Sequence, residues 1–271
     1  MMNLSVFVTT FNNERTLAAC LESVRWAEEI VLLDSFSTDA TVQIARRYGC
    51  RISRHEFLGY GRQKQLALEQ TRHRWVLLLD ADEALSPGSQ EEIRALLAAG
   101  PEADGYEIPR QEQLFWRMTS PHVRLNAFLR LFDKTKGRID DMPVHAAPKV
   151  EGVVRRLRHP FYHFGETDLH TKMDKLNHYS TGLVADKLAK GRGRSPWILV
   201  FYPPVYFLRS YLFKRNFLNG WAGFITSVCG AFYVFLKYAK TYEERQFRRY
   251  GTRLMPPGAP AAPRPARTQR Y

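Results

Sequence analysis

A buried strand that ends in two carboxylates limits the folds available to this chain. Residues 75–80 read Trp-Val-Leu-Leu-Leu-Asp and are followed by Ala81, Asp82 and Glu83. An apolar run without polar alternation is typical of a central strand in a parallel sheet that is covered on both faces. The carboxyl ends of such strands form the ligand-binding edge of α/β folds, so Asp80 and Asp82 are predicted to lie at a binding site.

The spacing of these two acids suits a divalent cation. Asp-x-Asp puts two carboxylates on the same side of an extended backbone, where both can face one cation and a diphosphate bound to it. The pattern therefore favours a nucleotide-sugar site. An Asp-x-Asp that stands alone is more often a solvated acidic turn, so the prediction depends on the rest of the chain.

Strands and helices alternate through the first 80 residues and predict an α/β fold with a mostly parallel, doubly wound sheet. Helical periodicity follows each of the first three strands, and small or polar residues stand at the expected helix starts. Strands are expected at residues 4–10, 29–34, 51–54, 75–80, 105–109 and 127–132. Residues 169–190 are expected to be helical, with one apolar face formed by Leu176, Tyr179, Leu183 and Leu188.

Polar residues follow three of these strands at the point where each ends. They are Thr10, Asn12 and Glu14 after the first strand, Asp34 and Asp39 after the second, and Asp80 and Asp82 after the fourth. Each loop alone is explained by helix capping. Since the carboxyl ends of parallel strands meet along one edge, we expect all three loops to converge there.

Four motifs between Val8 and Glu83 resemble the donor-binding half of the inverting family 2 glycosyltransferases, which have the GT-A fold. The motifs are Val8–Glu14, Asp34–Asp39, Gly59–Lys64 and Leu77–Glu83. Within that family the sequence is most similar to the branch of lipopolysaccharide inner-core glucosyltransferases that add a β-1,4-linked glucose to heptose. Further segments that resemble this branch are Arg130–Phe132, Pro143–His145, Gly165, Phe217–Gly223 and Lys237–Lys240. The resemblance covers roughly residues 3–244.

This resemblance implies a UDP-sugar donor and roles for individual residues. Asp34 would recognise the uracil, Thr10 and Glu14 would line the uridine pocket, and Lys64 would lie near the nucleotide. Asp82 would ligate the Mg²⁺ or Mn²⁺ that bridges the two phosphates, because a cation stabilises the charge on the departing diphosphate. Asp80 would face the ribose or the metal. The expected donor-binding set also includes Asn12, Asp39 and Arg130, the last at the phosphates unless it is only a surface charge.

Inversion by direct displacement requires a base that takes the proton from the acceptor hydroxyl. The related branch typically has a carboxylate directly after the residue that matches His145, whereas this chain has Ala146. Asp141 is the predicted base, with Asp140 next and Glu151 third. His145 is a further candidate, either as the base itself or as a hydrogen-bonding support for it.

The basic charge of the chain is concentrated in its last third. Residues 1–185 carry 24 Lys+Arg and 24 Asp+Glu, whereas residues 186–271 carry 16 Lys+Arg and 3 Asp+Glu. These cations border aromatic and aliphatic runs, which favours an anionic membrane surface over nucleic acid as partner. The three cysteines form no CxxC pattern, so neither a disulfide framework nor a zinc site is expected, and no signal peptide is expected at the N-terminus.

Two uncharged runs, 195–208 and 216–236, predict a monotopic anchor made of interfacial helices. A membrane hairpin and a buried helical core are the alternatives. The expected division of the chain is a GT-A domain at 1–190 (donor half about 3–100, acceptor half about 101–190), a membrane-association region at 191–244, and a basic disordered tail at 245–271.

The sequence thus predicts a metal-dependent inverting glycosyltransferase at the cytoplasmic face of the inner membrane, peripheral or monotopic. It would move a sugar, with glucose expected, from a UDP-sugar to a lipid-linked saccharide such as lipopolysaccharide core. Two alternatives remain: a sugar-phosphate nucleotidyltransferase, and a catalytically inactive membrane-binding scaffold of the same fold. Oligomeric state is not predicted.

Overall fold

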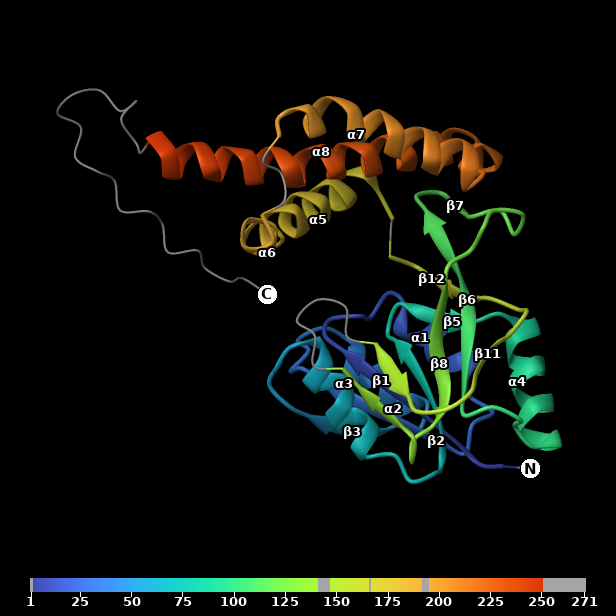
Figure 1. Cartoon of the computed structure of the whole chain (residues 1–271). Coiled ribbons are helices and arrows are strands. Elements are labelled where there is room, and N and C mark those ends of the chain that lie inside the picture. The colour runs from blue at the N-terminus through green and yellow to red at the C-terminus, as the bar shows by residue number, and fades with distance from the viewer. Residues whose placement is uncertain (1, 141–146, 166, 192–194, 251–271) are drawn as a thin grey trace. The chain divides into compact units, whose positions relative to one another are not determined.

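The computed structural model describes residues 2–140, 147–165, 167–191 and 195–250 (Figure 1). The chain divides into two compact units. The first comprises Met1–Lys172 and Tyr211–Thr226, and the second comprises Met173–Ser210 and Ser227–Tyr271. The domain limits expected near residues 190 and 244 stay a prediction.

The first unit is built on a mixed sheet whose donor-side half is parallel. Its strands are β1 (Leu4–Thr10), β2 (Glu29–Asp34), β3 (Arg51–Arg54) and β4 (Trp75–Asp80), and the helices between them are α1 (Leu17–Ser23), α2 (Thr41–Arg47) and α3 (Tyr60–Glu69). The strand order is β3-β2-β1-β4. Successive strands are added on one side of β1 up to β3 and on its other side from β4, and β1 pairs in parallel with both β2 and β4. Such a reversal in strand order is where α/β sheets bind ligands, as the sequence predicts.

Most of the remaining strands extend this sheet, whereas residues 137–139 and 148–150 pair with each other in a separate two-stranded sheet. β8 pairs antiparallel with β4 and with β6, so the whole sheet is mixed, in the order β3-β2-β1-β4-β8-β6-β12-β5. The elements of this half are β5 (Glu83–Leu85), α4 (Pro87–Ala99), β6 (Gly105–Leu114), β7 (Arg117–Met118), β8 (Ala127–Asp133), β9 (Gly137–Ile139), β10 (Pro148–Val150), β11 (Val154–Arg156) and β12 (Phe161–His163).

The apolar strands are buried on both faces, because alternate side chains enter two separate cores. Val6 and Leu77 belong to one hydrophobic cluster, and Phe7 and Leu78 belong to the other. All four side chains are fully buried. This double burial explains why the strands lack the polar alternation of a half-exposed sheet.

One carboxylate ties the amino ends of the strands together, at the edge opposite the predicted site. Glu29 accepts hydrogen bonds from the Ser5 hydroxyl at 2.5 Å, from the Arg72 backbone N–H at 2.8 Å and from the Arg51 guanidinium at 3.0 Å. Its side chain is 8% exposed. Burial acts to raise the pKa of Glu29, but these hydrogen bonds outweigh it and lower the pKa below its usual value.

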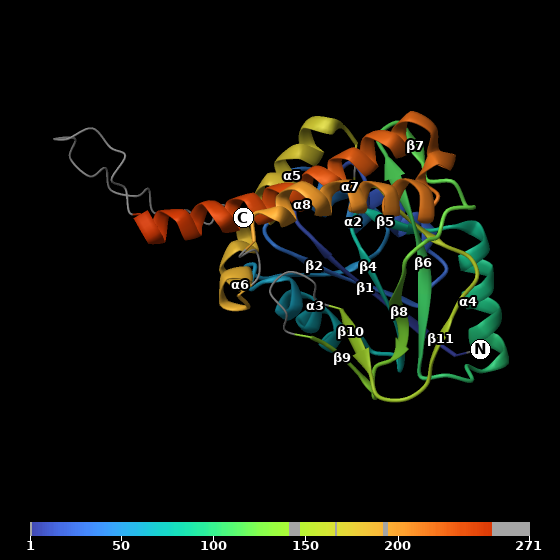
Figure 2. The ribbon, with the colours of Figure 1, turned by 45° about the horizontal axis from the view of Figure 1, so that its top comes forward.

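The second unit is helical. Its elements are most of α5 (Leu169–Gly182), α6 (Val184–Ala189), α7 (Trp197–Leu208), the start of the π-helical turn η1 (Arg209–Phe213), and the larger part of α8 (Gly220–Tyr250), which follows the short helix η2 (Asn216–Asn219). α7 lies beside α8 in both ribbon views (Figures 1 and 2). Lys240 of α8 holds α5 by donating hydrogen bonds to the Asn177 carbonyl and to the Ser180 hydroxyl.

Residues 216–250 form the single helix of the described segments that is long and apolar enough to cross a membrane by length and composition. α8 continues to Tyr250, so residues 245–250 of the expected tail are helical. The rest of that tail, 251–271, lies outside the described residues.

Candidate active site

Strand register brings the predicted acids together. Thr10 is the register partner of Asp34 across β1 and β2, and Thr9 is the partner of Asp80 across β1 and β4. Three strand ends therefore deliver their side chains to one edge of the sheet, as the sequence predicts. We call the residues gathered at this edge the strand-end site. They are Thr10, Asp34, Asp80 and Asp82, together with the side chains that contact these acids.

Two cations hold Asp80. Lys64, which α3 places almost fully buried, lies with its Nζ 2.6 Å from Asp80 Oδ1. The Nη2 atom of Arg130, a residue of β8, lies 3.4 Å from Asp80 Oδ2 and 2.5 Å from Glu83 Oε1. Arg130 is 5% exposed and its guanidinium lies 5.2 Å from the centre of the Phe161 ring. It is therefore a buried part of the site and not a surface charge.

The charges in this cluster shift one another's ionisation. Burial acts to raise the pKa of Asp80, but Lys64 and Arg130 outweigh it and hold that pKa well below its usual range. Burial raises the pKa of Glu83 to about 7, against the effect of Arg130. Asp80 thus stays ionised near neutral pH, whereas Glu83 is the carboxylate of this cluster that gains a proton most readily.

Asp82 faces a histidine that the sequence analysis missed. His163 of β12 lies with its Nε2 3.3 Å from Asp82 Oδ2 and with its Nδ1 2.5 Å from Glu112 Oε2. Burial acts to lower the pKa of His163, but hydrogen bonds to both carboxylates raise it to about 10. The site thus contains a carboxylate–histidine–carboxylate row, of which the sequence predicted one member.

A glycine two residues further along the chain gives His163 its space. A Cβ atom at Gly165 would lie 2.5 Å from His163 Cε1, which is closer than side chains approach. The short His-Phe-Gly sequence was the available signal, because a glycine beside a histidine leaves room for the ring. That signal alone does not place His163 in the site. Its position also depends on the pairing of β12 with β5 and β6, which sets His163 opposite both Glu83 and Glu112.

The first and second loops are joined by hydrogen bonds among the predicted donor-binding residues. The Asn12 backbone N–H donates to the Ser37 hydroxyl at 2.9 Å, and the Glu14 backbone N–H donates to Asp39 at 3.1 Å. Asp39 also accepts from the Thr41 backbone N–H at 2.9 Å. Asn12 and Glu14 are exposed, so their side chains remain accessible to a ligand.

Asp34 and Thr10 lie beneath these loops. The Asp34 side chain is fully buried, accepts from the Ser37 backbone N–H at 3.2 Å and lies 3.3 Å from Arg54 Nε. Thr10 is 4% exposed and donates its hydroxyl hydrogen to Asn13. Both residues are therefore buried at the strand ends, and a direct contact of either with a uridine stays a prediction.

The predicted base belongs to the segment between β9 and β10. Asp141 and His145 lie outside the described residues. Asp140 follows β9 and lies 2.6 Å from Lys149 Nζ. Glu151 is 81% exposed at its side chain and pairs with Arg138. The choice among these carboxylates stays a prediction.

The strand-end site fits a cation that is held jointly by the protein and a diphosphate. The described residues include no cluster of three His, Cys, Asp or Glu side chains spaced to hold a metal alone. Asp82 would supply an oxygen, and His163 would supply a nitrogen once the cation displaces its Nε2 proton, while Glu112 holds the imidazole through Nδ1. Mg²⁺ commonly takes one or two protein ligands and completes its shell with phosphate oxygens and water.

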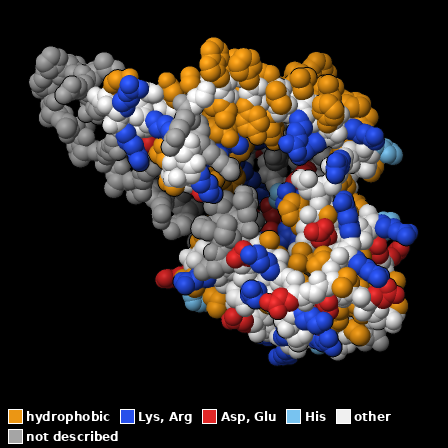
Figure 3. All heavy atoms as spheres, in the orientation of Figure 1, with side chains coloured by type: hydrophobic (Ala, Val, Ile, Leu, Met, Phe, Trp, Pro, Cys, Tyr) orange, Lys and Arg blue, Asp and Glu red, His pale blue; other side chains and the backbone are white. Residues whose placement is uncertain are grey.

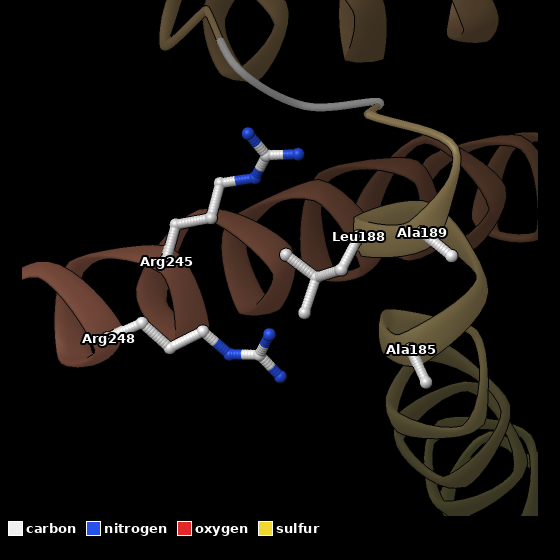
Figure 4. Close-up of a pocket in the computed structure, with 5 residues that line it drawn as sticks. All are labelled: Ala185, Leu188, Ala189, Arg245 and Arg248. Atoms are coloured by element: carbon white, nitrogen blue, oxygen red, sulfur yellow. The ribbon is translucent and has the colours of Figure 1, made fainter.

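A cavity of about 420 Å³ lies elsewhere, in the second unit (Figure 4). It is lined by Ala185, Leu188, Ala189, Arg245 and Arg248. No predicted site residue lines it, and Arg248 also pairs with Glu244. We assign it no part in the strand-end site.

Comparison with known proteins identifies the family. The Glycosyl transferase family 2 model matches residues 5–156. The chain is 35% identical over 253 residues to the lipopolysaccharide core biosynthesis glycosyltransferase LpsC of Rhizobium meliloti, covering 90% of this chain and 94% of that protein. It is 30% identical over 260 residues to an uncharacterized glycosyltransferase of Rickettsia typhi, covering 90% and 88% of the two chains.

Among solved structures, Staphylococcus aureus TarS 1-349 in complex with UDP-GlcNAc matches with a TM-score of 0.47 at 17% identity, over 90% of this chain and 92% of that one. The family match covers more than half of the chain, and LpsC is similar along nearly all of it. The chain therefore belongs to glycosyl transferase family 2 and has the GT-A fold.

Proposed function

We propose that this glycosyltransferase moves a sugar, with glucose expected, from a UDP-sugar to a lipid-linked saccharide such as lipopolysaccharide core, with inversion. The observation that carries the proposal is the strand-end site, where two buried cations and the Asp82–His163 pair meet at the ligand edge of the sheet. LpsC, the 35% identical relative, is named for lipopolysaccharide core biosynthesis. That name supports the choice of acceptor class.

The proposed binding of the donor divides the work among these residues. Lys64 and Arg130 supply positive charge beside Asp80, which suits the phosphates of a nucleoside diphosphate. Asp82 and Asp80 are proposed to hold Mg²⁺ or Mn²⁺, and His163 would join them once its Nε2 proton is displaced. The bound cation would stabilise the negative charge that grows on the leaving diphosphate. Burial of the cluster strengthens each of these electrostatic interactions.

Proton removal from the acceptor is assigned to Asp141, with Asp140, His145 and Glu151 as the alternatives. A base must stand on the face of the sugar opposite the diphosphate, because inversion needs attack from that side. Glu112 is a poor candidate. Burial acts to raise its pKa, but the hydrogen bond from His163 and the charge of Arg110 outweigh it and lower the pKa.

We further propose that the enzyme works at the cytoplasmic face of the inner membrane as a peripheral protein. Its acceptor would be lipid-linked, and the basic last third of the chain suits an anionic surface. One helix, 216–250, is apolar enough for membrane association.

UDP release tests the proposal. Purified protein would be incubated with a panel of UDP-sugars and Mn²⁺, with and without a heptose-containing core oligosaccharide. We expect release of UDP that depends on the acceptor and on one UDP-sugar, and that chelation of the cation stops. Release that is absent with every UDP-sugar would refute the donor assignment, and release that persists without the cation would refute the metal assignment.

A further inference from the structure

α8 exposes a regular row of large apolar side chains. Trp221, Phe224, Val228, Phe232 and Phe235 follow one another at intervals of three or four residues, and each is between 37% and 75% exposed. Residues at these intervals lie on one side of a helix. We call this row the α8 stripe.

The other side of α8 is packed and partly polar. Ser227 and Thr241 are fully buried there, and Val234 and Tyr238 are nearly so. The exposed side is thus aromatic while the packed side carries hydroxyl groups. A surface helix of a soluble protein has the opposite arrangement, with its apolar side packed and its polar side in water. An exposed apolar row of this length marks an interaction surface.

α7 adds a second row of the same kind. Trp197, Phe201, Val205 and Leu208 are each between 48% and 65% exposed, again at intervals of three or four residues. α7 meets α8 through other residues: the Tyr202 ring lies 5.8 Å from the Tyr238 ring, and a Cβ at Gly230 would touch Tyr206. Figure 3 shows hydrophobic side chains gathered over these helices.

The charge around these rows fits anionic lipid headgroups. Between Asp186 and Glu243 the sequence has nine Lys or Arg residues and no Asp or Glu. A second copy of the chain docked on the same rows would bring these cations close to their equivalents, whereas anionic headgroups would neutralise them. Aromatic residues with adjacent cations are typical of the membrane–water boundary.

Two contacts of α8, which we call its ties, indicate whether this helix lies on a bilayer or crosses it. At its first turns, Ala222 packs in one buried cluster with Leu114 and Phe115 of the β6–β7 turn. Near its other end, Lys240 donates hydrogen bonds to Asn177 of α5. A crossing α8 would put these two ties on opposite sides of a hydrocarbon layer about 30 Å thick.

The segment that joins the two ties is unsuited to hydrocarbon. The chain from β12 to Asn177 carries charged residues, among them Asp168, Lys172, Asp174 and Lys175. A crossing α8 would draw this segment through the bilayer as well, and charges inside the hydrocarbon are strongly unfavourable. An α8 that lies along the surface keeps both ties and the joining segment on the watery side.

We propose that α8 lies in the plane of an anionic membrane surface, with the α8 stripe and the exposed row of α7 inserted at the headgroup boundary. The inference deepens the proposed function, since it rests on an acceptor that is held in the membrane. Both rows would then anchor the enzyme where such acceptors are confined.

Depth-dependent fluorescence quenching tests the orientation. In the full chain, W116F, W197F and W221F leave Trp26 and Trp75 as a constant background. A tryptophan is then restored at 221 or placed by Phe235→Trp, two positions that are 14 residues, or about 21 Å, apart along the helix axis. Vesicles of phosphatidylcholine and phosphatidylglycerol would carry bromine at defined acyl positions.

We expect both tryptophans to be quenched at the same shallow depth, within about 5 Å of each other. Depths that differ by more than about 10 Å would mean a crossing or steeply tilted helix and would overturn the inference. The absence of quenching would also overturn it. A protein that does not bind the vesicles and sediments as a dimer would overturn it as well, because the rows would then bind a second copy.

A pair of charge substitutions provides the control. Phe232→Glu should weaken vesicle binding about tenfold or more, because it removes an exposed ring that would insert at the headgroup boundary and adds an anion. Leu169→Glu changes a residue that is likewise exposed but off both rows, and an acid suits the first turn of α5, so vesicle binding should stay unchanged. UDP release with a soluble acceptor should be the same in both variants. A protein that never releases UDP would overturn the proposed function but leave the quenching result decisive for this inference.

Discussion

Replacing Glu29 by Gln should destabilise the protein without altering its site. Gln keeps the size of the side chain but removes the charge that holds Ser5, Arg51 and Arg72. A hydrogen bond to a charged group contributes about 1.5–3 kcal/mol, and several to one carboxylate do not add fully. Gln can still accept some of these hydrogen bonds, so we expect a loss of about 2–4 kcal/mol, which lowers Tm by about 5–10 °C in a protein of this size.

The stabilisation that Glu29 provides should depend on pH. The pKa of Glu29 is lowered by folding, so its stabilisation is fully present above the unfolded value of 4.5 and is lost as the pH falls through the folded value. Urea unfolding of wild type and Glu29→Gln should therefore differ most at pH 7, and the difference should shrink as the pH falls below 4.5. Glu91→Gln, an exposed carboxylate on α4, serves as the matched control and should behave as wild type at both pH values.

Two results would refute the reasoning. Equal stability of the two proteins at pH 7 would mean that the hydrogen bonds to Glu29 contribute nothing. A gap that persists unchanged in acid would mean that the loss comes from packing and not from charge. UDP-sugar affinity of the folded variant should match wild type, because Glu29 lies at the opposite edge of the sheet from the strand-end site.

Three further predictions concern the site. Asp82→Ala should abolish UDP release while the protein still folds, with Tm lowered only by the loss of the His163 contact, since this half-exposed carboxylate adds little to the core; near-normal turnover would remove it from the site. Asp141→Asn should lower turnover by about 10²–10⁴ with UDP-sugar binding unchanged by calorimetry, and the same pattern in Asp140→Asn instead would transfer the role of base. Gly165→Ala should weaken Mn²⁺-dependent binding of UDP by about 10–100-fold, because the new Cβ pushes the His163 ring away; unchanged binding would show that the ring position does not matter.

The donor half of the fold could be predicted because its signals are local. Each of β1, β2 and β4 is a single apolar run that ends in a polar residue, and parallel pairing then fixes where Thr10, Asp34 and Asp80 must lie. Lys64 follows from the helix that opens at Gly59. In such segments the sequence pattern and the three-dimensional position carry the same information.

His163 and Glu112 could not be found in this way. They lie 51 residues apart and meet because β12 pairs with β6 in one particular register. β12 is three residues long, and so short a strand has no periodicity to read. A shift of that register by one residue would turn His163 to the other face of the sheet, away from Asp82.

The apolar face expected on α5 and α6 was wrong at Tyr179. Tyr179 is 44% exposed, whereas Ser180, Val184 and Lys187 are buried. The reason is the Lys240 side chain, which takes its hydrogen-bond acceptors from the side of α5 that carries Ser180. A polar contact between helices thus decided which side of α5 is packed, and hydrophobic spacing does not record such contacts.

The order of strands in the sheet also bears on how the enzyme assembles during synthesis. All pairings among β1 to β4 join residues between Leu4 and Asp80, so the donor half is complete early in the chain. β12, by contrast, pairs with β5 only after some 80 further residues have been made. Local contacts form faster than distant ones. We therefore expect pulsed hydrogen exchange during refolding to protect β1 before β12, so that the nucleotide half takes shape first and His163 joins it last; simultaneous protection would contradict this order.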